Sequence, residues 1–401
     1  MFDVLIDQVK VLDMHSGEES LKKVGIKGNR IAAILPYSTA PVIARKVIDG
    51  KGAYLFPGFI DFHTHLFQHG SGFGMDGDQL LAAGITTAVD MGTAGYANYP
   101  AFHQCDVQGK KIRIRSFLNL SPIGQPGKGI SEPMDRAVLN LEKMEELLDQ
   151  YPGEIAGIKI RTSANIVGTL GLEPLRTAVE YGEMLGLPVC VHTTNPPASA
   201  SAVAEILRPG DIYCHLYHAV GRTILDTNGH VEKGVLQARE RGILFDLGNG
   251  KMNFNFVVAE AAMREGLYPD FISSDSTPAT FHKSELMWDL PRCMSKLLYL
   301  GMPLTEVLRS VTETPAKMLG LAHRIGKVAE GYEADLILCR MKKGEIIFGD
   351  SRGETRKGSQ WLEPEKTLIA GRVVWEKETE AVGYLNRLFV LDKLSTVHLK
   401  H

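Results

Sequence analysis

The chain has 401 residues, and 44 Lys plus Arg against 47 Asp plus Glu give a formal net charge of −3. This balance argues against broad binding to nucleic acid or a membrane surface, and a hydrophobic fraction of 44% excludes wholesale disorder. The sequence has no apolar run near the roughly 20 residues of a membrane span. It starts without an apolar signal core, and its five Cys lack framework spacing, so we expect a cytoplasmic protein.

The predicted elements begin with small β-structure, where Val24–Ile31 has the alternation of a hairpin across Gly28 and Asn29. Short apolar or β-branched runs then recur about every 30 residues, the length of a strand–helix unit. The eight runs are Gly58–Phe62, Thr86–Val89, Ile114–Leu118, Ile155–Ile160, Val189–Val191, Ile212–Cys214, Ile243–Leu247 and Phe271–Ser273.

Helical patterns separate these runs, most clearly over Asp135–Gln150 and Glu173–Leu185, where apolar residues recur every three to four positions. Eight alternating units favour an α/β fold of the closed (β/α)8 TIM-type barrel over an open, doubly wound sheet. We therefore predict a barrel over residues 56–324.

The sequence returns to a β pattern after the barrel, in Ala334–Leu338 and Thr367–Val374. Each flank of the barrel is too short to hold a core alone. We therefore predict one small, discontinuous β-sandwich domain from residues 1–55 and 325–380, followed by a C-terminal tail over 381–401.

Catalytic residues of such barrels lie at the C-terminal ends of the strands. The first run ends at His63 and His65, which are two residues apart, so both imidazoles face the same side. Lys159 lies inside the fourth run, where a buried ammonium is costly unless its charge is removed or paired. Three further runs end in residues that can ligate a metal: His192, His215 and Asp275.

Each of these residues also has an ordinary explanation. Two nearby His are commonly polar loop residues, a mid-strand Lys can reach outward between helices, and a lone Asp often caps a helix. Three such residues ending three separate strands are hard to explain separately. Because four His, one Asp and one buried Lys suit a borderline divalent ion such as zinc, we predict a metal site.

Other residues near the strand ends leave alternatives open. Arg161 shares an inward face with Lys159 and could bind a substrate carboxylate or form a salt bridge at the rim. His218 could contact substrate, support the site or have no role. Packing is the better interpretation of Cys190. Four histidines have no convergent partners and are interpreted as solvated or packing residues: His69, His103, His282 and His323.

The segment Pro57–His65 resembles the first-strand signature of the amidohydrolase superfamily of metal-dependent hydrolases. Lys159, His192, His215 and Asp275 match the ligands of its fourth, fifth, sixth and eighth strands. Further likenesses are Thr312–Leu321, similar to the last barrel helix, and Gly331–Leu336, similar to the return into the sheet domain. Within the superfamily, Gly84–Gly95 and the Lys159-x-Arg161 pair resemble a dihydroorotase-related branch of deacetylases.

This resemblance implies two divalent metal ions, expected to be zinc. His63, His65 and Asp275 would hold the more buried ion, and His192 and His215 the more exposed one. A carbamylated Lys159 would bridge both ions, and Asp275 would shuttle protons for a metal-bridging hydroxide.

The branch acts on N-acetyl-D-amino acids and acetylated α-hydroxy acids, so we expect a small, carboxylate-bearing substrate. Asn249 stands between Gly248 and Gly250 where the family pattern has a histidine. This departure leaves the ligands untouched and makes Asn249, with Arg161 and His218, a candidate substrate contact. We also expect a homo-oligomer.

Three alternatives remain. One is a cyclic amide hydrolase of the dihydroorotase or hydantoinase kind. Another is an NAD-dependent oxidoreductase, because Gly72–Gly77 spells G-x-G-x-x-G and Asp90 follows 18 residues after Gly72. About ten residues separate these glycines from the preceding strand, which weakens this hypothesis. The third is a barrel that has lost its metals, against which the complete ligand set argues.

Overall fold

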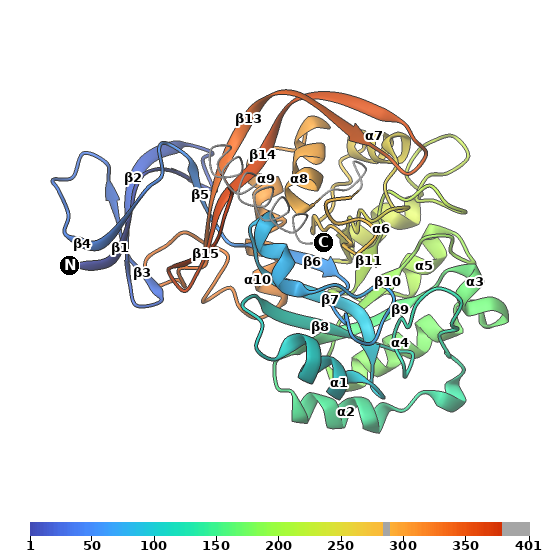
Figure 1. The fold of residues 1–401 in the computed structure, drawn as a ribbon. Coiled ribbons are helices and arrows are strands. Elements are labelled where there is room, and N and C mark those ends of the chain that lie inside the picture. Colours follow the sequence, from blue (N-terminus) through green and yellow to red (C-terminus); the bar gives the residue numbers. More distant parts are fainter. Residues whose placement is uncertain (284–288, 379–401) are drawn as a thin grey trace, which may run out of the picture.

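The computed structural model describes residues 1–283 and 289–378, so the predicted tail over 381–401 lies outside the described residues. The described chain forms two sheets, a curled parallel sheet at the centre of the larger part and a mixed sheet beside it (Figure 1). This arrangement confirms the predicted TIM-type barrel with a flanking β region.

The barrel sheet has seven parallel strands whose spatial order follows the chain, β12-β11-β10-β9-β8-β7-β6. Its strands are β6 (Phe59–Thr64), β7 (Ile85–Gly95), β8 (Arg113–Asn119), β9 (Ile155–Arg161), β10 (Val189–His192), β11 (Ile212–Cys214) and β12 (Leu244–Asp246). Seven of the eight predicted runs are therefore strands, close to their expected bounds except that β7 continues from the predicted Val89 to Gly95.

The eighth predicted run, Phe271–Ser273, is not a regular strand. It lies between the two edge strands and makes isolated parallel bridges, from Phe271 to Asp246 of β12 and from Ser276 to Thr64 of β6. The ladder is interrupted because polar side chains take over its hydrogen bonds. The N–H of Ser274, for example, donates to Asp61 Oδ1 at 3.0 Å instead of to a neighbouring carbonyl.

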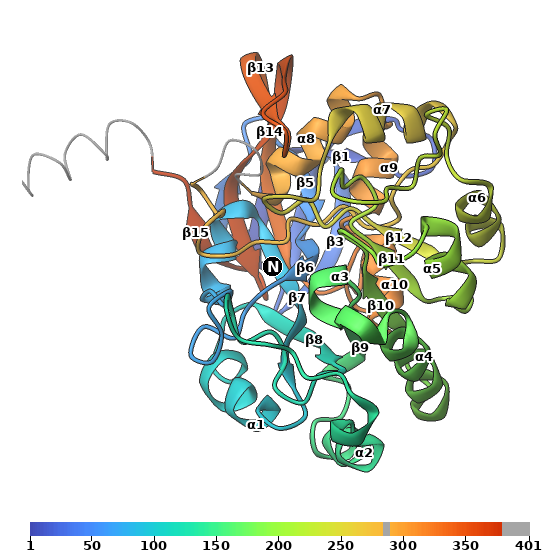
Figure 2. The ribbon, with the colours of Figure 1, turned by 90° about the vertical axis from the view of Figure 1, so that its right-hand side faces the viewer.

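Helices lie around the outside of the barrel strands (Figure 2). They are α1 (Tyr99–Phe102), α2 (Leu141–Gln150), α3 (Ala164–Val167), α4 (Glu173–Leu185), α5 (Ala200–Ile206), α6 (Lys233–Glu240), α7 (Phe256–Arg264), α8 (Leu290–Tyr299), α9 (Leu304–Arg309) and α10 (Glu313–Met318). None of the described helices is long and apolar enough to cross a membrane.

The two predicted helices fared differently. Glu173–Leu185 matches α4, which ends at Gly186 in the left-handed conformation. The helix expected over Asp135–Gln150 begins only at Leu141, because the Asn140 side chain accepts from the N–H of Lys143 and caps it there.

The two flanks pair into one sheet, as expected. Its strands are β1 (Phe2–Leu12), β2 (Glu19–Lys27), β3 (Arg30–Pro36), β4 (Ala44–Asp49), β5 (Tyr54–Pro57), β13 (Leu336–Gly349), β14 (Thr355–Ile369) and β15 (Arg372–Glu376). Hydrogen bonding is continuous through β15-β14-β13-β5-β1-β2-β3, with β4 added to β1, so the expected sandwich is a single mixed sheet. The antiparallel pairing of β5 with β13 joins the two ends of the chain.

The hairpin of β13 and β14 is much longer than the predicted strands and passes over the barrel toward α7 (Figure 1). Charged residues such as Lys342 and Lys343 interrupt the apolar pattern there, which explains why the sequence pattern marked only its ends. At its tip, Asp350 Oδ2 accepts from Asn255 Nδ2 at 2.8 Å, and Arg356 pairs with Glu260 of α7 at 3.1 Å.

Buried side chains from the barrel strands form a cluster of their own. Its members are Phe62, Val89, Met91, Phe117, Cys190, Ile212, Cys214 and Phe271. The rings of Phe62 and Phe271 stack with centroids 4.0 Å apart, which packs the eighth segment against β6. The barrel is thus a packed core, and space for a ligand lies at its end.

Candidate functional site

A cavity of about 460 Å³ lies at the C-terminal ends of the barrel strands. All six predicted metal ligands line it, together with Arg161: His63, His65, Lys159, His192, His215 and Asp275. The cavity is also lined by Phe73, Asn165, Thr194 and Asn253. The structure therefore brings together residues that lie more than 200 positions apart in the sequence.

The ends of β6 and of the eighth segment form the tightest group. His65 Nε2 lies 3.0 Å and His63 Nε2 3.7 Å from Asp275 Oδ1. The N–H of Asp275 donates to the carbonyl of His63 at 2.8 Å. Asp275 has a φ of 53°, which is uncommon for a residue with a side chain. The surrounding structure therefore holds its backbone in an unfavourable conformation, as is frequent at functional sites.

The outward-facing nitrogens of three histidines all have partners. His63 Nδ1 lies 2.8 Å from Asp246 Oδ2, His65 Nδ1 lies 3.0 Å from Thr93 Oγ1, and His215 Nδ1 lies 2.8 Å from the carbonyl of Gly248. Partners of this kind orient imidazoles that ligate metals and leave Nε2 as the donor atom.

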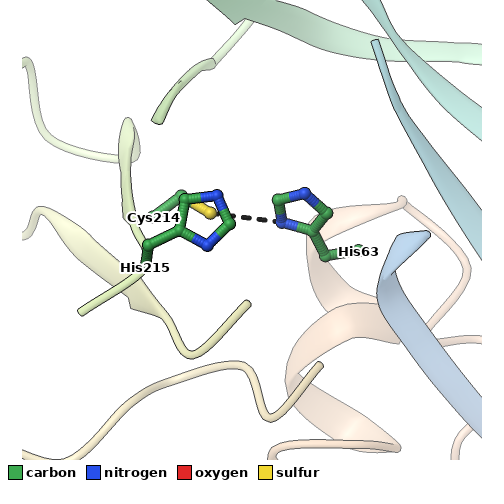
Figure 3. Close-up of side chains that lie close together, drawn as sticks. All are labelled: His63, Cys214 and His215. Atoms are coloured by element: carbon green, nitrogen blue, oxygen red, sulfur yellow. Dashed lines mark hydrogen bonds between the residues drawn. The ribbon is translucent and has the colours of Figure 1, made fainter. Parts of the chain in front are cut away.

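Asp246 lies beside the predicted ligand His63 and was not singled out from the sequence. It ends β12, is fully buried, and accepts from the Cys214 thiol at 3.0 Å and from Ser273 Oγ at 2.5 Å. Cys214 Sγ also lies 3.1 Å from His63 Nδ1, a contact drawn in Figure 3. The sequence feature that could have pointed to Asp246 is the presence of a carboxylate inside the apolar run Ile243–Leu247.

The protonation states of Asp246, Asp275 and Cys214 follow from their burial and from the groups that they contact. Burial opposes ionisation of Asp246, but the hydrogen bond and charge of His63 hold its pKa below the ordinary value. Burial likewise opposes ionisation of Asp275, but His63 and His65 hold its pKa well below the ordinary value. Burial raises the pKa of the Cys214 thiol well above its usual range, so the thiol stays a donor.

His192 and His215 form the second pair of imidazoles. Their ring centroids are 4.3 Å apart, and those of His63 and His215 are 5.1 Å apart. Burial lowers the pKa of His192 and of His215 well below the ordinary value. Both rings are therefore neutral near pH 7, the form that ligates a metal.

Lys159 lies at the base of the cavity and is only 1% exposed. Its Nζ lies 3.6 Å from Cys190 Sγ, and no carboxylate of the described residues forms an ion pair with it. Burial acts to lower the pKa of Lys159, but the buried acidic groups around it, led by Cys190 and Cys214, raise the pKa above its ordinary value. Burial thus disfavours the ammonium form of Lys159, while the acidic groups around it favour that form.

Asn253 also escaped sequence reasoning, although it lines the cavity. Its Nδ2 donates to Asp275 Oδ2 at 2.9 Å, and its Oδ1 accepts from Thr194 Oγ1 at 2.8 Å. The second bond fixes which way the amide points, so Asn253 acts as a donor toward Asp275. Its sequence context, a glycine-rich loop after a strand, carried no specific signal.

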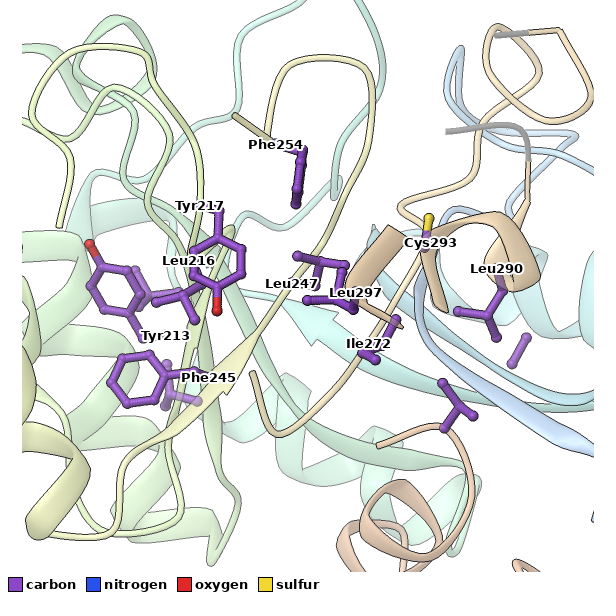
Figure 4. Packing of buried hydrophobic residues seen from close by; sticks show 14 of the residues in the cluster. Tyr213, Leu216, Tyr217, Phe245, Leu247, Phe254, Ile272, Leu290, Cys293 and Leu297 are labelled. Carbon is purple, nitrogen blue, oxygen red and sulfur yellow. The ribbon is translucent and has the colours of Figure 1, made fainter. Parts of the chain in front are cut away.

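The glycines before Asn253 allow this loop to approach the site. A Cβ at Gly250 would lie 2.2 Å from Asp275 Oδ2, and one at Gly248 would lie 2.5 Å from His215 Nδ1. Both glycines have positive φ, 44° and 46°. Buried side chains on either side of the loop, including Leu247 and Phe254, belong to the large core shown in Figure 4.

Arg161 reaches the cavity from the end of β9. Its Nη1 donates to Glu132 Oε1 at 2.6 Å, while Arg161 Nε and Glu132 Oε2 are buried without a hydrogen-bond partner. Burial raises the pKa of Glu132 above its ordinary value despite the charge of Arg161. The sequence had not singled out Glu132.

Two predicted substrate contacts do not line the cavity. Asn249 is fully buried and its Oδ1 accepts from Lys296 Nζ at 3.0 Å. His218 is also buried; its Nδ1 accepts from the N–H of Val220 at 3.3 Å, and burial lowers its pKa to about 4. Both side chains are buried away from the cavity lining, whereas Arg161, the third predicted substrate contact, does line the cavity.

The four histidines interpreted as solvated or packing residues lie outside the cavity. His69, His103 and His282 face the carboxylates of Asp106, Glu154 and Asp289, respectively, and His323 is exposed. Cys190 is buried in the barrel core, as expected.

The glycine-rich segment Gly72–Gly77 does not form a dinucleotide site. Phe73 lines the metal-site cavity, and a Cβ at Gly74 would lie 2.0 Å from the carbonyl oxygen of Phe67, so the segment packs against its own chain. Asp90, the expected ribose ligand, is buried and accepts from the N–H groups of Leu66 and Thr93. The oxidoreductase hypothesis is therefore wrong in its structural premise.

Comparison with known proteins agrees with this geometry. Residues 54–374 match the amidohydrolase family. The chain is 32% identical to a deacetylase of Brucella anthropi over 355 residues, which cover 87% of this chain and 86% of that protein.

Two solved structures are similar over most of the chain. One is an adenine deaminase, with a TM-score of 0.86 and 27% identity, and the other is a dihydroorotase, with a TM-score of 0.82 and 30% identity. Each alignment covers 94% of this chain and 100% of the other. Because the family match spans far more than half of its length, this chain belongs to the amidohydrolase family and is a hydrolase acting on carbon–nitrogen bonds.

Proposed function

We propose that this hydrolase removes the acetyl group from a small molecule that carries a carboxylate, either an N-acetyl amino acid or an O-acetylated α-hydroxy acid. The observation that carries the proposal is the convergence of four buried His, Asp275 and Lys159 on one cavity that also contains Arg161. The similarity to a protein named a deacetylase supports the acetyl group.

The donor set fits two divalent ions, with zinc as the expected metal. Donor atoms of His63, His65 and Asp275 all lie within 4.8 Å of one another. Neutral imidazoles and a carboxylate are ligands that zinc prefers. In this proposal, these three residues hold one ion, His192 and His215 hold the other, and Lys159 contributes to both through a carbamate on Nζ.

A carbamate on Lys159 is supported by its surroundings. An ammonium that is 1% exposed and has no carboxylate partner within residues 1–283 and 289–378 carries a large burial cost. Loss of a proton from the ammonium, followed by addition of the neutral amine to CO2 with release of a second proton, would replace this cation with a carbamate anion whose two oxygens suit divalent ions. Gly92 makes room for the side chain, since a Cβ there would lie 2.6 Å from Lys159 Cβ.

When bound, two such ions polarise an acyl carbonyl and lower the pKa of a water molecule toward neutrality. In the proposed reaction Asp275 takes a proton from the attacking water and passes it to the leaving amine nitrogen or alkoxide oxygen. Asn253 occupies Asp275 Oδ2, which keeps Oδ1 directed toward His63 and His65.

Arg161 is the proposed contact for the substrate carboxylate. Its side chain lines the cavity two residues beyond Lys159 on the same strand. A planar guanidinium suits a carboxylate because it can donate two parallel hydrogen bonds.

A second candidate function is hydrolysis of a cyclic amide, which the similarity to a dihydroorotase favours. The same ligand set serves both reactions in this scheme, because each cleaves an acyl bond, amide or ester, with water.

A hydrolysis screen tests the proposal. Zinc-loaded protein should hydrolyse members of a panel of N-acetyl-D-amino acids, N-acetyl-L-amino acids and acetylated hydroxy acids, and elemental analysis should find about two metal ions per chain. Turnover of dihydroorotate or hydantoin alone would replace the proposal with the second candidate. Inactivity toward the whole panel would overturn both. The homo-oligomeric state and the cytoplasmic location stay predictions.

A further inference from the structure

A buried carboxylate that the proposed reaction does not use holds the guanidinium of Arg161. Glu132 Oε1 accepts from Arg161 Nη1 at 2.6 Å, and the Glu132 side chain is only 3% exposed. Glu132 belongs to the long segment between β8 and α2, whereas Arg161 ends β9. The fold therefore brings a loop carboxylate onto a residue of the cavity wall.

This ion pair is incomplete. Arginine and a carboxylate satisfy each other best through two parallel hydrogen bonds. Here one bond forms, and Glu132 Oε2 and Arg161 Nε remain buried without a partner among the residues that the structure describes. Buried polar atoms are usually hydrogen-bonded, and each unmade bond costs free energy. Glu132 and Arg161 thus form fewer hydrogen bonds with each other than a fully paired carboxylate and guanidinium would. Of the two, Arg161 lines the cavity.

We propose that Glu132 is a specificity-determining, positioning residue, which holds Arg161 by one nitrogen so that its remaining donors are available to a substrate carboxylate. The inference rests on the proposed function, in which Arg161 binds that carboxylate. A guanidinium has about five N–H donors in one plane, so a single bond to Glu132 restricts its position and leaves most donors unused.

The geometry also favours a positioning role over a purely structural one. A structural pair would gain most by forming the second bond, which the buried, unpartnered Oε2 and Nε show is absent. An arginine held in advance loses less side-chain entropy when the substrate binds, so its contribution should appear in KM.

The test uses N-acetylglycine and N-acetylglycinamide, which differ only in whether a carboxylate or a neutral amide follows the α-carbon. Glu132→Ala should raise KM for N-acetylglycine about 10-fold, the effect of losing one charge-assisted orienting bond, and should change kcat little. KM for N-acetylglycinamide should stay unchanged. Glu132→Gln retains an acceptor of the same shape and should recover most of the affinity for N-acetylglycine.

A double-mutant cycle with Arg161→Met sharpens this test. If Glu132 acts through Arg161, Glu132→Ala should have no further effect on KM in the Arg161→Met background. An unchanged KM for N-acetylglycine in Glu132→Ala overturns the proposal. Equal rises for the acid and the amide, or an effect that persists without Arg161, overturn it as well.

Calorimetric binding of N-acetylglycine to zinc-loaded protein separates this inference from the proposed function. Binding that weakens in both Glu132→Ala and Arg161→Met without any turnover would overturn deacetylation of this compound and still support the role of Glu132. Binding that weakens in Arg161→Met alone would overturn only the role of Glu132. Absence of binding to the wild-type protein would overturn both.

Discussion

The two sides of the cavity differ in how completely their polar atoms are paired. On the side formed by β6, β12 and the eighth segment, His63 and His65 each have a partner for the outward nitrogen, and Asp275 has one for Oδ2. On the side formed by β9 and the loop before α2, Arg161 Nε and Glu132 Oε2 have no partner in the described part of the chain.

This difference separates two tasks. Metal ligands work best when a surrounding set of hydrogen bonds already fixes their orientation, because the ion then loses no affinity to reorganisation. A substrate contact must keep donors available until the substrate arrives. Under the proposed function, the paired His63, His65 and Asp275 fit the first task and the incompletely paired Arg161 fits the second.

The largest expected effect comes from Asp275. Asp275→Asn should lower kcat by about 10²–10⁴-fold or more, because the amide can neither accept the proton nor ligate as a carboxylate does. The side chain keeps its shape, so the thermal midpoint should change little. Near-wild-type turnover in this variant would remove Asp275 as the proton shuttle.

Arg161→Met should have the next largest effect. Loss of a bidentate, charge-assisted contact should raise KM for acidic substrates roughly 100-fold and leave neutral substrates almost unaffected. The measurement is the ratio of KM values for N-acetylglycine and its amide. An unchanged ratio would show that the incompletely paired side does not bind a carboxylate.

A substitution at Asp246 tests the side of the cavity formed by β6, β12 and the eighth segment. Asp246→Asn should weaken metal affinity about 10–100-fold, measured by competition with a chelator, because His63 loses the carboxylate that orients it. Asp106→Asn is the matched control, since Asp106 pairs with His69 at 2.7 Å outside the cavity. Equal losses in the two variants would contradict a specific role for Asp246.

Asn253 should show the smallest effect of the four. Asn253→Ala should lower kcat about 10-fold, the effect of losing one hydrogen bond to a charged group, with little change in KM. Asn165→Ala is a control in the same cavity, because Asn165 makes no hydrogen bond to Asp275 among the described residues. A similar kcat in both variants would show that Asn253 does not position Asp275.

Much of the barrel was predictable from the sequence because it depends on local patterns. Short apolar runs at regular spacing indicated seven strands, and a helix pattern closed by Gly186 indicated α4. The prediction of an eighth regular strand was wrong because Ser274 hydrogen-bonds to the side chain of Asp61 instead of to a neighbouring strand. Asp61 lies more than 200 residues away in the sequence. The full length of the β13–β14 hairpin was not predicted, because the charged residues in its middle lack strand-like alternation.

The sequence by itself determined which side chains meet, since strand-end residues of parallel strands share one end of a barrel. His63, His65, His192, His215 and Asp275 were found in this way, because each ends or closely follows an apolar run. Only the tertiary structure decided what surrounds them. Asp246 behind His63, Asn253 beside Asp275 and Glu132 on Arg161 come from distant segments, and side-chain contacts of that range leave no local pattern.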